Sequence, residues 1–230
     1  MSATTTLESL PPDEAERAAA RRRSWVLVAV CTGLIAVVAS VSGLNVAQGQ
    51  LAAELGASQS QLLWVINGYT IALAALLLPI GAIGDRWGRK QVLMSGLVLF
   101  VLANVAAAFS GSVNQLLVAR VVAGAAAAMI MPVTLSVITS TFPEEDRDRA
   151  IGVWAGFAGA GGILGLLSSS IVVDNFTWPW VFLAPTVLAL AAFAMTAVFV
   201  PRSREDHQGR IDTLGSFLSA FVVGGLVLAV

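Results

Sequence analysis

A short charged run inside an otherwise apolar sequence is the first candidate for chemistry. Residues 81–90 read Gly-Ala-Ile-Gly-Asp-Arg-Trp-Gly-Arg-Lys, which places Asp85 four residues before Arg89. A carboxylate and a guanidinium form charge-assisted hydrogen bonds that are made in one conformation and broken in another. The run therefore suits a gate between two states, although a basic loop that only sets topology is a competing interpretation. The candidate gating residues are Gly81, Asp85, Arg86, Gly88, Arg89 and Lys90.

Arg120 is the second candidate, because it is a charge within the apolar stretch 114–140. A charge at the centre of a membrane span costs about 2.5–3.5 kcal/mol on insertion scales, so such residues face a cavity or a partner and are functional by default. The competing interpretation is a structural arginine that donates to backbone carbonyls or extends its head to the membrane surface. We expect a functional role.

Residues for metal binding or enzymatic catalysis are scarce. The chain has one cysteine, Cys31, and one histidine, His207, which lies in a polar segment. This composition offers no disulfide framework, no cysteine-based or histidine-based metal centre and no Ser/His/Asp arrangement. We therefore expect a protein that is not an enzyme and holds no cofactor or metal.

The candidates lie in or between apolar stretches of membrane-spanning length. Of 230 residues, 57% are hydrophobic and 12% charged, with a mean hydropathy of +0.83. A bilayer core needs about 20 mostly apolar residues per helix, and six such stretches follow a polar leader over residues 1–24. A polar linker at 201–212 precedes a further apolar stretch at 213–230, which reaches Val230 without a polar flank, so we expect a piece of a longer chain. The predicted spans are 25–47, 62–84, 91–110, 114–140, 150–173 and 179–200.

Basic residues mark one side of these spans. Of the 13 Lys and Arg residues, all except Arg120 lie in the leader or in the second, fourth and sixth breaks. The first, third and fifth breaks carry none. Because basic loops stay in the cytoplasm, we expect a multi-pass protein of the plasma membrane with its amino terminus in the cytoplasm. The net charge of −1 gives no reason to expect a nucleic-acid partner.

Four motifs together resemble a known transporter family. The G-x-x-x-D-R-x-G-R-K run at 81–90 resembles the motif of the major facilitator superfamily between its second and third spans. Three stretches are similar to motifs of its fourteen-span drug:proton antiporter branch: Trp64–Tyr69, Leu116–Gly124 and Gly209–Gly215. The resemblance implies an all-α transmembrane fold, with an amino-terminal six-helix bundle over 25–200 and the start of a seventh helix.

Two motifs depart from the pattern of that branch. Its first span carries an embedded aspartate, and that position is Ser40 here, while Asn45-Val46-Ala47 keep the family residues. Its fifth span carries a glycine run ending G-P-x-x-G-G, of which the proline position is Leu166. No Asp or Glu lies well inside the six predicted spans. The glycines retained from the fifth-span motif include Gly156, Gly161 and Gly165.

The resemblance implies export of lipophilic or amphipathic small molecules by alternating access, in exchange for protons and together with a second bundle outside this chain. It ties Arg120 to proton coupling. A facilitator or a lipid or metabolite exporter without proton coupling is one alternative, suggested by Ser40. A half-transporter that moves nothing is another, suggested by the end of the chain at Val230. Polar and aromatic side chains in spans tend to face protein or water, which makes the candidate cavity residues Asn45, Gln48, Trp64, Asn67, Tyr69 and Arg120.

Overall fold

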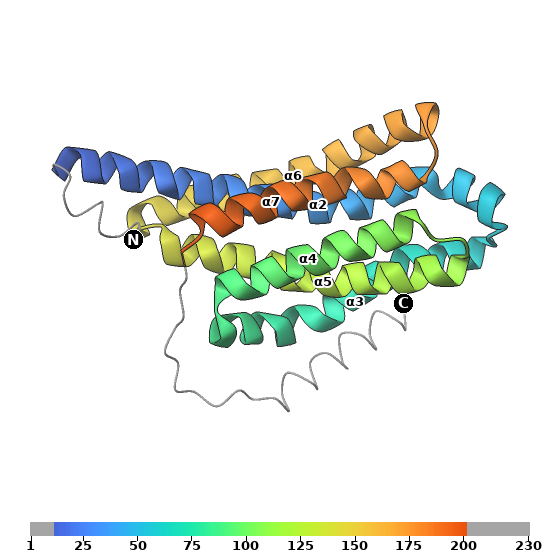
Figure 1. Cartoon of the computed structure of the whole chain (residues 1–230), viewed down its shortest axis with the longest axis horizontal. Helices are drawn as coiled ribbons and strands as arrows, with labels where there is room; N and C mark the ends of the chain where they lie inside the picture. Colours follow the sequence, from blue (N-terminus) through green and yellow to red (C-terminus); the bar gives the residue numbers. More distant parts are fainter. Residues whose placement is uncertain (1–11, 202–230) are drawn as a thin grey trace.

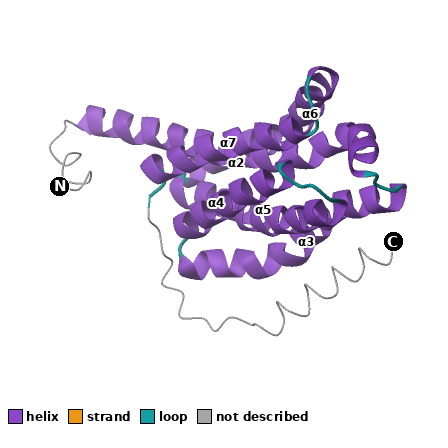
Figure 2. Ribbon diagram, turned by 45° about the vertical axis from the view of Figure 1, so that its right-hand side comes forward, coloured by secondary structure: helices purple, strands orange, loops and turns teal. Residues whose placement is uncertain are grey.

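The computed structural model describes residues 12–201, without the side chains of residues 12, 13 and 82–86, and the secondary structure of this part is entirely helical (Figure 2). Six of its helices are long and apolar enough to cross a membrane, which confirms the predicted all-α transmembrane class. The predicted seventh span, 213–230, and the linker beyond Pro201 lie outside the described residues. The helices are α2 (Pro12–Leu55), α3 (Gln59–Trp87), α4 (Arg89–Ala108), α5 (Val113–Thr141), α6 (Glu144–Asn175) and α7 (Pro179–Phe199).

Helix α2 extends well beyond the span predicted at 25–47. Its 44 residues correspond to about 66 Å at 1.5 Å per residue, twice the thickness of a hydrocarbon core. The predicted polar leader is therefore helical from Pro12, and the first break is helical up to Leu55. Residues 13–24 are rich in Ala, Arg and Glu, which are strong helix formers, and proline is well suited to the first helical position. The amino-terminal part of α2 projects past the other helices (Figure 1).

The helices pack as two similar groups of three. The main contacts join α2 to α6, α3 to α5, α2 to α7, α4 to α5 and α4 to α7. Let α2, α3 and α4 correspond to α5, α6 and α7. The contact of α2 with α6 then corresponds to that of α5 with α3, and the contact of α2 with α7 corresponds to that of α5 with α4. The contact α4 with α7 maps onto itself. This symmetry is that of two three-helix repeats, in which α2 and α5 are equivalent central helices.

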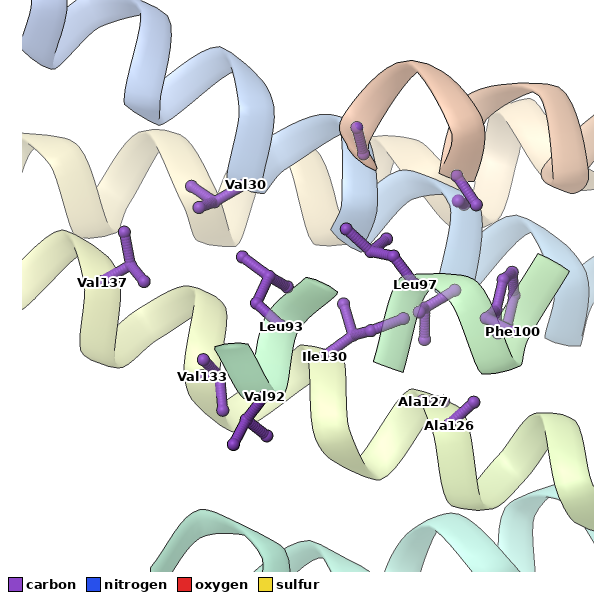
Figure 3. Packing of buried hydrophobic residues seen from close by; sticks show 14 of the residues in the cluster. Val30, Val92, Leu93, Leu97, Phe100, Ala126, Ala127, Ile130, Val133 and Val137 are labelled. Carbon is purple, nitrogen blue, oxygen red and sulfur yellow. The ribbon is translucent and has the colours of Figure 1, made fainter. Parts of the chain in front are cut away.

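The interior contains two apolar clusters along the bundle axis. The larger one surrounds Leu97 and Ile130 where α2, α4, α5 and α7 meet (Figure 3). The second surrounds Leu44 and Leu116 toward the other end of the bundle. Arg120 lies on α5 between residues of the two clusters, one turn after Leu116 and one turn before Ala123. A charge is thus held between two apolar clusters of the interior.

Candidate functional site: a buried arginine between five helices

Helix α5 carries Arg120 into the middle of the bundle. The helix continues from Arg120 into a run of small residues, including Ala123, Gly124 and Ala126–Ala128, all of which are buried. Small residues let neighbouring backbones approach closely; a Cβ at Gly124 would collide with the carbonyl oxygen of Tyr69 on α3. This approach brings the Tyr69 side chain beside Arg120, whose own side chain is 1% exposed.

Two polar side chains from α2 and α4 reach Arg120. Its Nη1 donates a hydrogen bond to Ser40 Oγ at 3.1 Å, and Ser40 Oγ donates to Asn104 Oδ1 at 3.2 Å. Asn104 Nδ2 donates to the Phe100 carbonyl at 2.8 Å, which fixes its orientation. Ser40 and Asn104 are 3% and 0% exposed, so the chain of hydrogen bonds is shielded from lipid and water. Nε and Nη2 of Arg120 have no partner among the described residues.

Aromatic rings cover the faces of the guanidinium. Arg120 Cζ lies 4.2 Å from the centroid of the Tyr69 ring and 6.0 Å from that of Phe182 on α7. The Tyr69 hydroxyl donates to the Val37 carbonyl at 3.2 Å, which ties α3 to α2. Arg120, Ser40, Asn104, Tyr69 and Phe182 are called the Arg120 cluster below. It joins five helices around one charge.

The charge of the Arg120 cluster is stabilised by dipoles and a ring face. Arg120 forms no ion pair with any residue that the structure describes. A desolvated cation–π contact contributes about 2 kcal/mol, and a hydrogen bond to a charged group about 1.5–3 kcal/mol. The partner of Arg120, Ser40, stands at the sequence position where the resemblance leads one to expect an aspartate, and it offers a neutral hydroxyl instead. The cluster holds a positive charge whose Nε and Nη2 groups are buried and have no hydrogen-bond partner among the described residues.

The cluster is closed off from the surface grooves. A groove of about 720 Å³ runs along α4 and α5 and is lined by Ala119 and Val122, but Arg120 does not line it. Arg120 and Tyr69, two of the candidate cavity residues, thus lie side by side inside the six-helix bundle. Any effect that they have on a substrate at the bundle surface must be transmitted by the helices that they join.

The other predicted cavity residues lie apart from Arg120. Asn45 and Asn67 are exposed on α2 and α3, and Trp64 is 50% exposed. Gln48 is half-buried, and its amide donates to the Asn45 carbonyl at 3.3 Å. None of these four side chains forms a hydrogen bond with a described member of the Arg120 cluster; those of Asn45 and Gln48 bond to carbonyls of their own helix.

The predicted gating run 81–90 spans the junction between α3 and α4. Gly88 has a φ of 101°, a conformation that favours glycine, and it turns the chain into α4. Arg89 is buried, at 8% exposed. Lys90 Nζ donates to the carbonyls of Ala197 and Val200, at 2.7 and 2.8 Å, and so caps the end of α7. The side chains of Asp85 and Arg86 lie outside the described part, and a Cβ added at Gly81 would lie 3.8 Å from Pro132 Cβ, an ordinary packing distance.

The fifth-span glycines differ in what they contact. A Cβ at Gly165 would lie 2.6 Å from the Ala39 Cα, and one at Gly161 would lie 3.3 Å from the Ile35 Cα. Both glycines therefore allow α6 to pack closely on α2. At Gly156 nothing lies within 4 Å of an added Cβ. Close helix packing explains two of the three retained positions.

Sequence reasoning missed two members of the cluster. Asn104 is a polar residue inside the predicted span 91–110, and its position within an apolar stretch was a usable signal of a buried polar contact. Phe182 has no comparable signal, because a phenylalanine in a span is ordinary.

Comparisons with known proteins agree with this architecture. Residues 28–229 match the family model of the Major Facilitator Superfamily. The chain is 42% identical over 182 residues to the methyl viologen resistance protein SmvA of Salmonella typhimurium, covering 78% of this chain and 37% of that protein. It is 33% identical over 210 residues to the multidrug efflux pump LfrA of Mycolicibacterium smegmatis, covering 90% and 42%. The chain therefore spans about two fifths of the length of these relatives.

A solved structure of the peptide transporter POT, in complex with sulfate, has the same fold. It superposes with a TM-score of 0.72 at 15% identity, over 89% of this chain and 44% of that one. At this identity the likeness concerns the fold alone. The family match, the relatives and the shared fold lead to one conclusion: the chain belongs to the Major Facilitator Superfamily of membrane transporters.

Proposed function

We propose that the transporter to which this chain contributes exports lipophilic or amphipathic small molecules in exchange for protons. The observation that carries the proposal is the similarity to proteins named for methyl viologen resistance and multidrug efflux. A relative from Streptomyces glaucescens, 31% identical over 209 residues, is named for tetracenomycin C resistance and export. The named compounds differ widely, which favours export of several amphipathic compounds.

Export proceeds by alternating access between this bundle and a second one. Substrate binds between the bundles near the middle of the membrane, where α2 and α3 present Asn45 and Asn67 on uncovered faces. The run 81–90 gates this movement: Gly88 supplies the turn, and Asp85 and Arg89 form and break contacts with the state of the transporter. The amino terminus lies in the cytoplasm, and the protein resides in the plasma membrane, as the distribution of basic residues suggests.

Arg120 acts in this mechanism as a positioning residue. It is buried beneath Tyr69 and joins α2 to α5 through Ser40, so it does not present its charge to a cationic substrate. A change in its hydrogen bonds alters the packing of the two central helices. Arg120 thereby couples proton movement elsewhere in the transporter to the arrangement of this bundle.

A transporter without proton coupling is the second candidate, and Ser40 favours it. A hydroxyl hydrogen-bonded between Arg120 and Asn104 does not exchange a proton as a carboxylate does. If coupling is present, its acid lies at another position of the complete protein.

The test uses the complete transporter in proteoliposomes loaded with a fluorescent lipophilic cation. Efflux is followed with and without an imposed pH gradient, for the unchanged protein, for Arg120→Ala and for the control Ser42→Ala. Ser42 lies on α2, two residues after Ser40, and forms no hydrogen bond with a described residue. We expect gradient-driven efflux that Arg120→Ala abolishes and Ser42→Ala retains. Efflux at the same rate with and without the gradient would favour a facilitator over an antiporter. No movement of the cation would refute export of this substrate class.

A further inference from the structure

A basic groove lies where the start of α2 passes the end of α7. It encloses about 680 Å³ and is lined by Arg17, Arg21, Arg22 and Trp25 of α2 and by Val198 and Phe199 of α7. Arg17 and Arg21 are four residues apart and lie on the same face of the helix, and Arg22 also lines the groove. This surface is called the basic groove below.

Two contacts fix the walls of the basic groove. Arg22 Nε donates to the Phe199 carbonyl at 3.3 Å, and the rings of Trp25 and Phe199 stack with centroids 5.3 Å apart and an angle of 13° between them. The stacked rings form an apolar floor beside the arginines. Arg17 and Arg21 are exposed, and neither forms a hydrogen bond or ion pair with a described residue.

The depth of these groups matches the boundary of a membrane. Counted from Trp25 at 1.5 Å per residue, Arg21 lies about 6 Å and Arg17 about 12 Å farther out. The headgroup layer of a leaflet is about 5–8 Å thick. Arg21 and Arg22 thus lie at headgroup depth, and Arg17 lies at its outer edge. The described acids of this segment, Glu14 and Glu16, precede the arginines and lie farther from the membrane.

The combination selects an anion that is attached to an apolar tail. Guanidinium groups bind phosphate oxygens in bidentate geometry, and tryptophan rings favour the membrane interface. A free phosphate ion would use the arginines but gain nothing from the stacked rings. We propose that the basic groove binds the phosphodiester headgroup of an anionic phospholipid, whose acyl chain lies along Trp25 and Phe199. The proposal rests on the membrane orientation proposed above.

A second basic hollow offers a matched comparison. It encloses about 370 Å³ on the other side of α2 and is lined by Arg23 and Arg149, but also by Asp146. Its two arginines are thus accompanied by an acid, and no aromatic pair like that of Trp25 and Phe199 lines it. Removing two charges there changes the net charge of the protein as much as removing two charges from the basic groove.

The experiment measures lipid binding to the complete transporter after delipidation in detergent, by native mass spectrometry. The added probes are phosphatidylglycerol, phosphatidylcholine with the same acyl chains, and inorganic phosphate. The variants are Arg17→Gln with Arg21→Gln, which leaves Arg22 in place, and the control Arg23→Gln with Arg149→Gln. Both are compared with the unchanged protein after their thermal unfolding shows that they are folded.

We expect retention of phosphatidylglycerol and neither of the other probes. Each arginine near an anionic surface contributes about fivefold in affinity, so the groove variant should bind about 30-fold more weakly. The control should change binding less than about threefold. Equal losses in the two variants would overturn the proposal in favour of general charge attraction, and equal binding of inorganic phosphate or phosphatidylcholine would overturn the lipid assignment. Transport is not the readout, so failure here does not bear on export.

Discussion

Replacing Ser40 by alanine tests whether a neutral hydroxyl stabilises the buried charge of Arg120. The substitution removes the acceptor 3.1 Å from Arg120 Nη1 and the donor to Asn104 Oδ1. Because Nε and Nη2 already lack a partner among the described residues, the guanidinium then retains only its contacts with aromatic rings. A lost hydrogen bond to a charged group costs about 1.5–3 kcal/mol and one between neutral groups about 0.5–1.5 kcal/mol. We expect Ser40→Ala to lower the free energy of unfolding by about 2–4 kcal/mol.

The assay is thermal unfolding of the complete transporter in detergent, where a loss of this size lowers the Tm by about 2–4 °C. Ser42→Ala, on the same helix, is the control and should leave the Tm within 1 °C of the unchanged protein, as expected of a substitution away from special contacts. A double-mutant cycle then assigns the cause: with Arg120→Leu already present, Ser40→Ala should cost at least about 1.5 kcal/mol less. An equal cost in both backgrounds would refute the reasoning, since the hydroxyl would then act independently of the arginine.

Three further contacts of the bundle can be tested by substitution. Tyr69→Phe keeps the ring over Arg120 and loses one hydrogen bond, so it should lower the free energy of unfolding by about 1 kcal/mol. Tyr69→Leu also loses the cation–π contact and should cost at least about 2 kcal/mol more. Equal costs in thermal unfolding would contradict the cation–π contact. Gly165→Ala should lower the free energy of unfolding by about 1–3 kcal/mol, because the new methyl group meets the backbone of α2. The control Gly156→Ala, where nothing lies within 4 Å, should not lower it. Similar Tm values for the two variants would argue against close packing of α6 on α2. Lys90→Met should raise amide hydrogen exchange in the last turn of α7, because the carbonyls of Ala197 and Val200 lose their donor. Unchanged exchange there would show that this cap contributes little.

The spans could be predicted from the sequence because hydropathy reports directly which segments prefer lipid. The predicted span 114–140 and the observed helix Val113–Thr141 differ by one residue at each end. The start of α2 was missed for a physical reason. Residues 12–24 are helical because Ala, Arg and Glu are strong helix formers, and a search for apolar stretches does not detect polar helix formers. Helix and membrane span are different properties, and they diverge here.

The site could be predicted only in part. Arg120 was identified because a charge within an apolar stretch is costly. Its partner Ser40 lies 80 residues away along the chain, and nothing in one sequence shows which faces of two helices meet. Polarity likewise flagged Asn67, although this residue is exposed and the members of the Arg120 cluster are buried. The type of a residue indicates that its side chain needs a polar contact, whereas the packing of the helices determines which residue is its partner.

Proton movement driven by substrate is the most direct test of the proposed antiport. The complete transporter is placed in proteoliposomes without an imposed pH gradient, a gradient of a lipophilic cation is applied, and the internal pH is followed with a trapped dye. An antiporter predicts that protons move opposite to the cation, and that Arg120→Ala removes this movement while Ser42→Ala retains it. Transport of the cation at an unchanged internal pH would contradict the account and establish a facilitator.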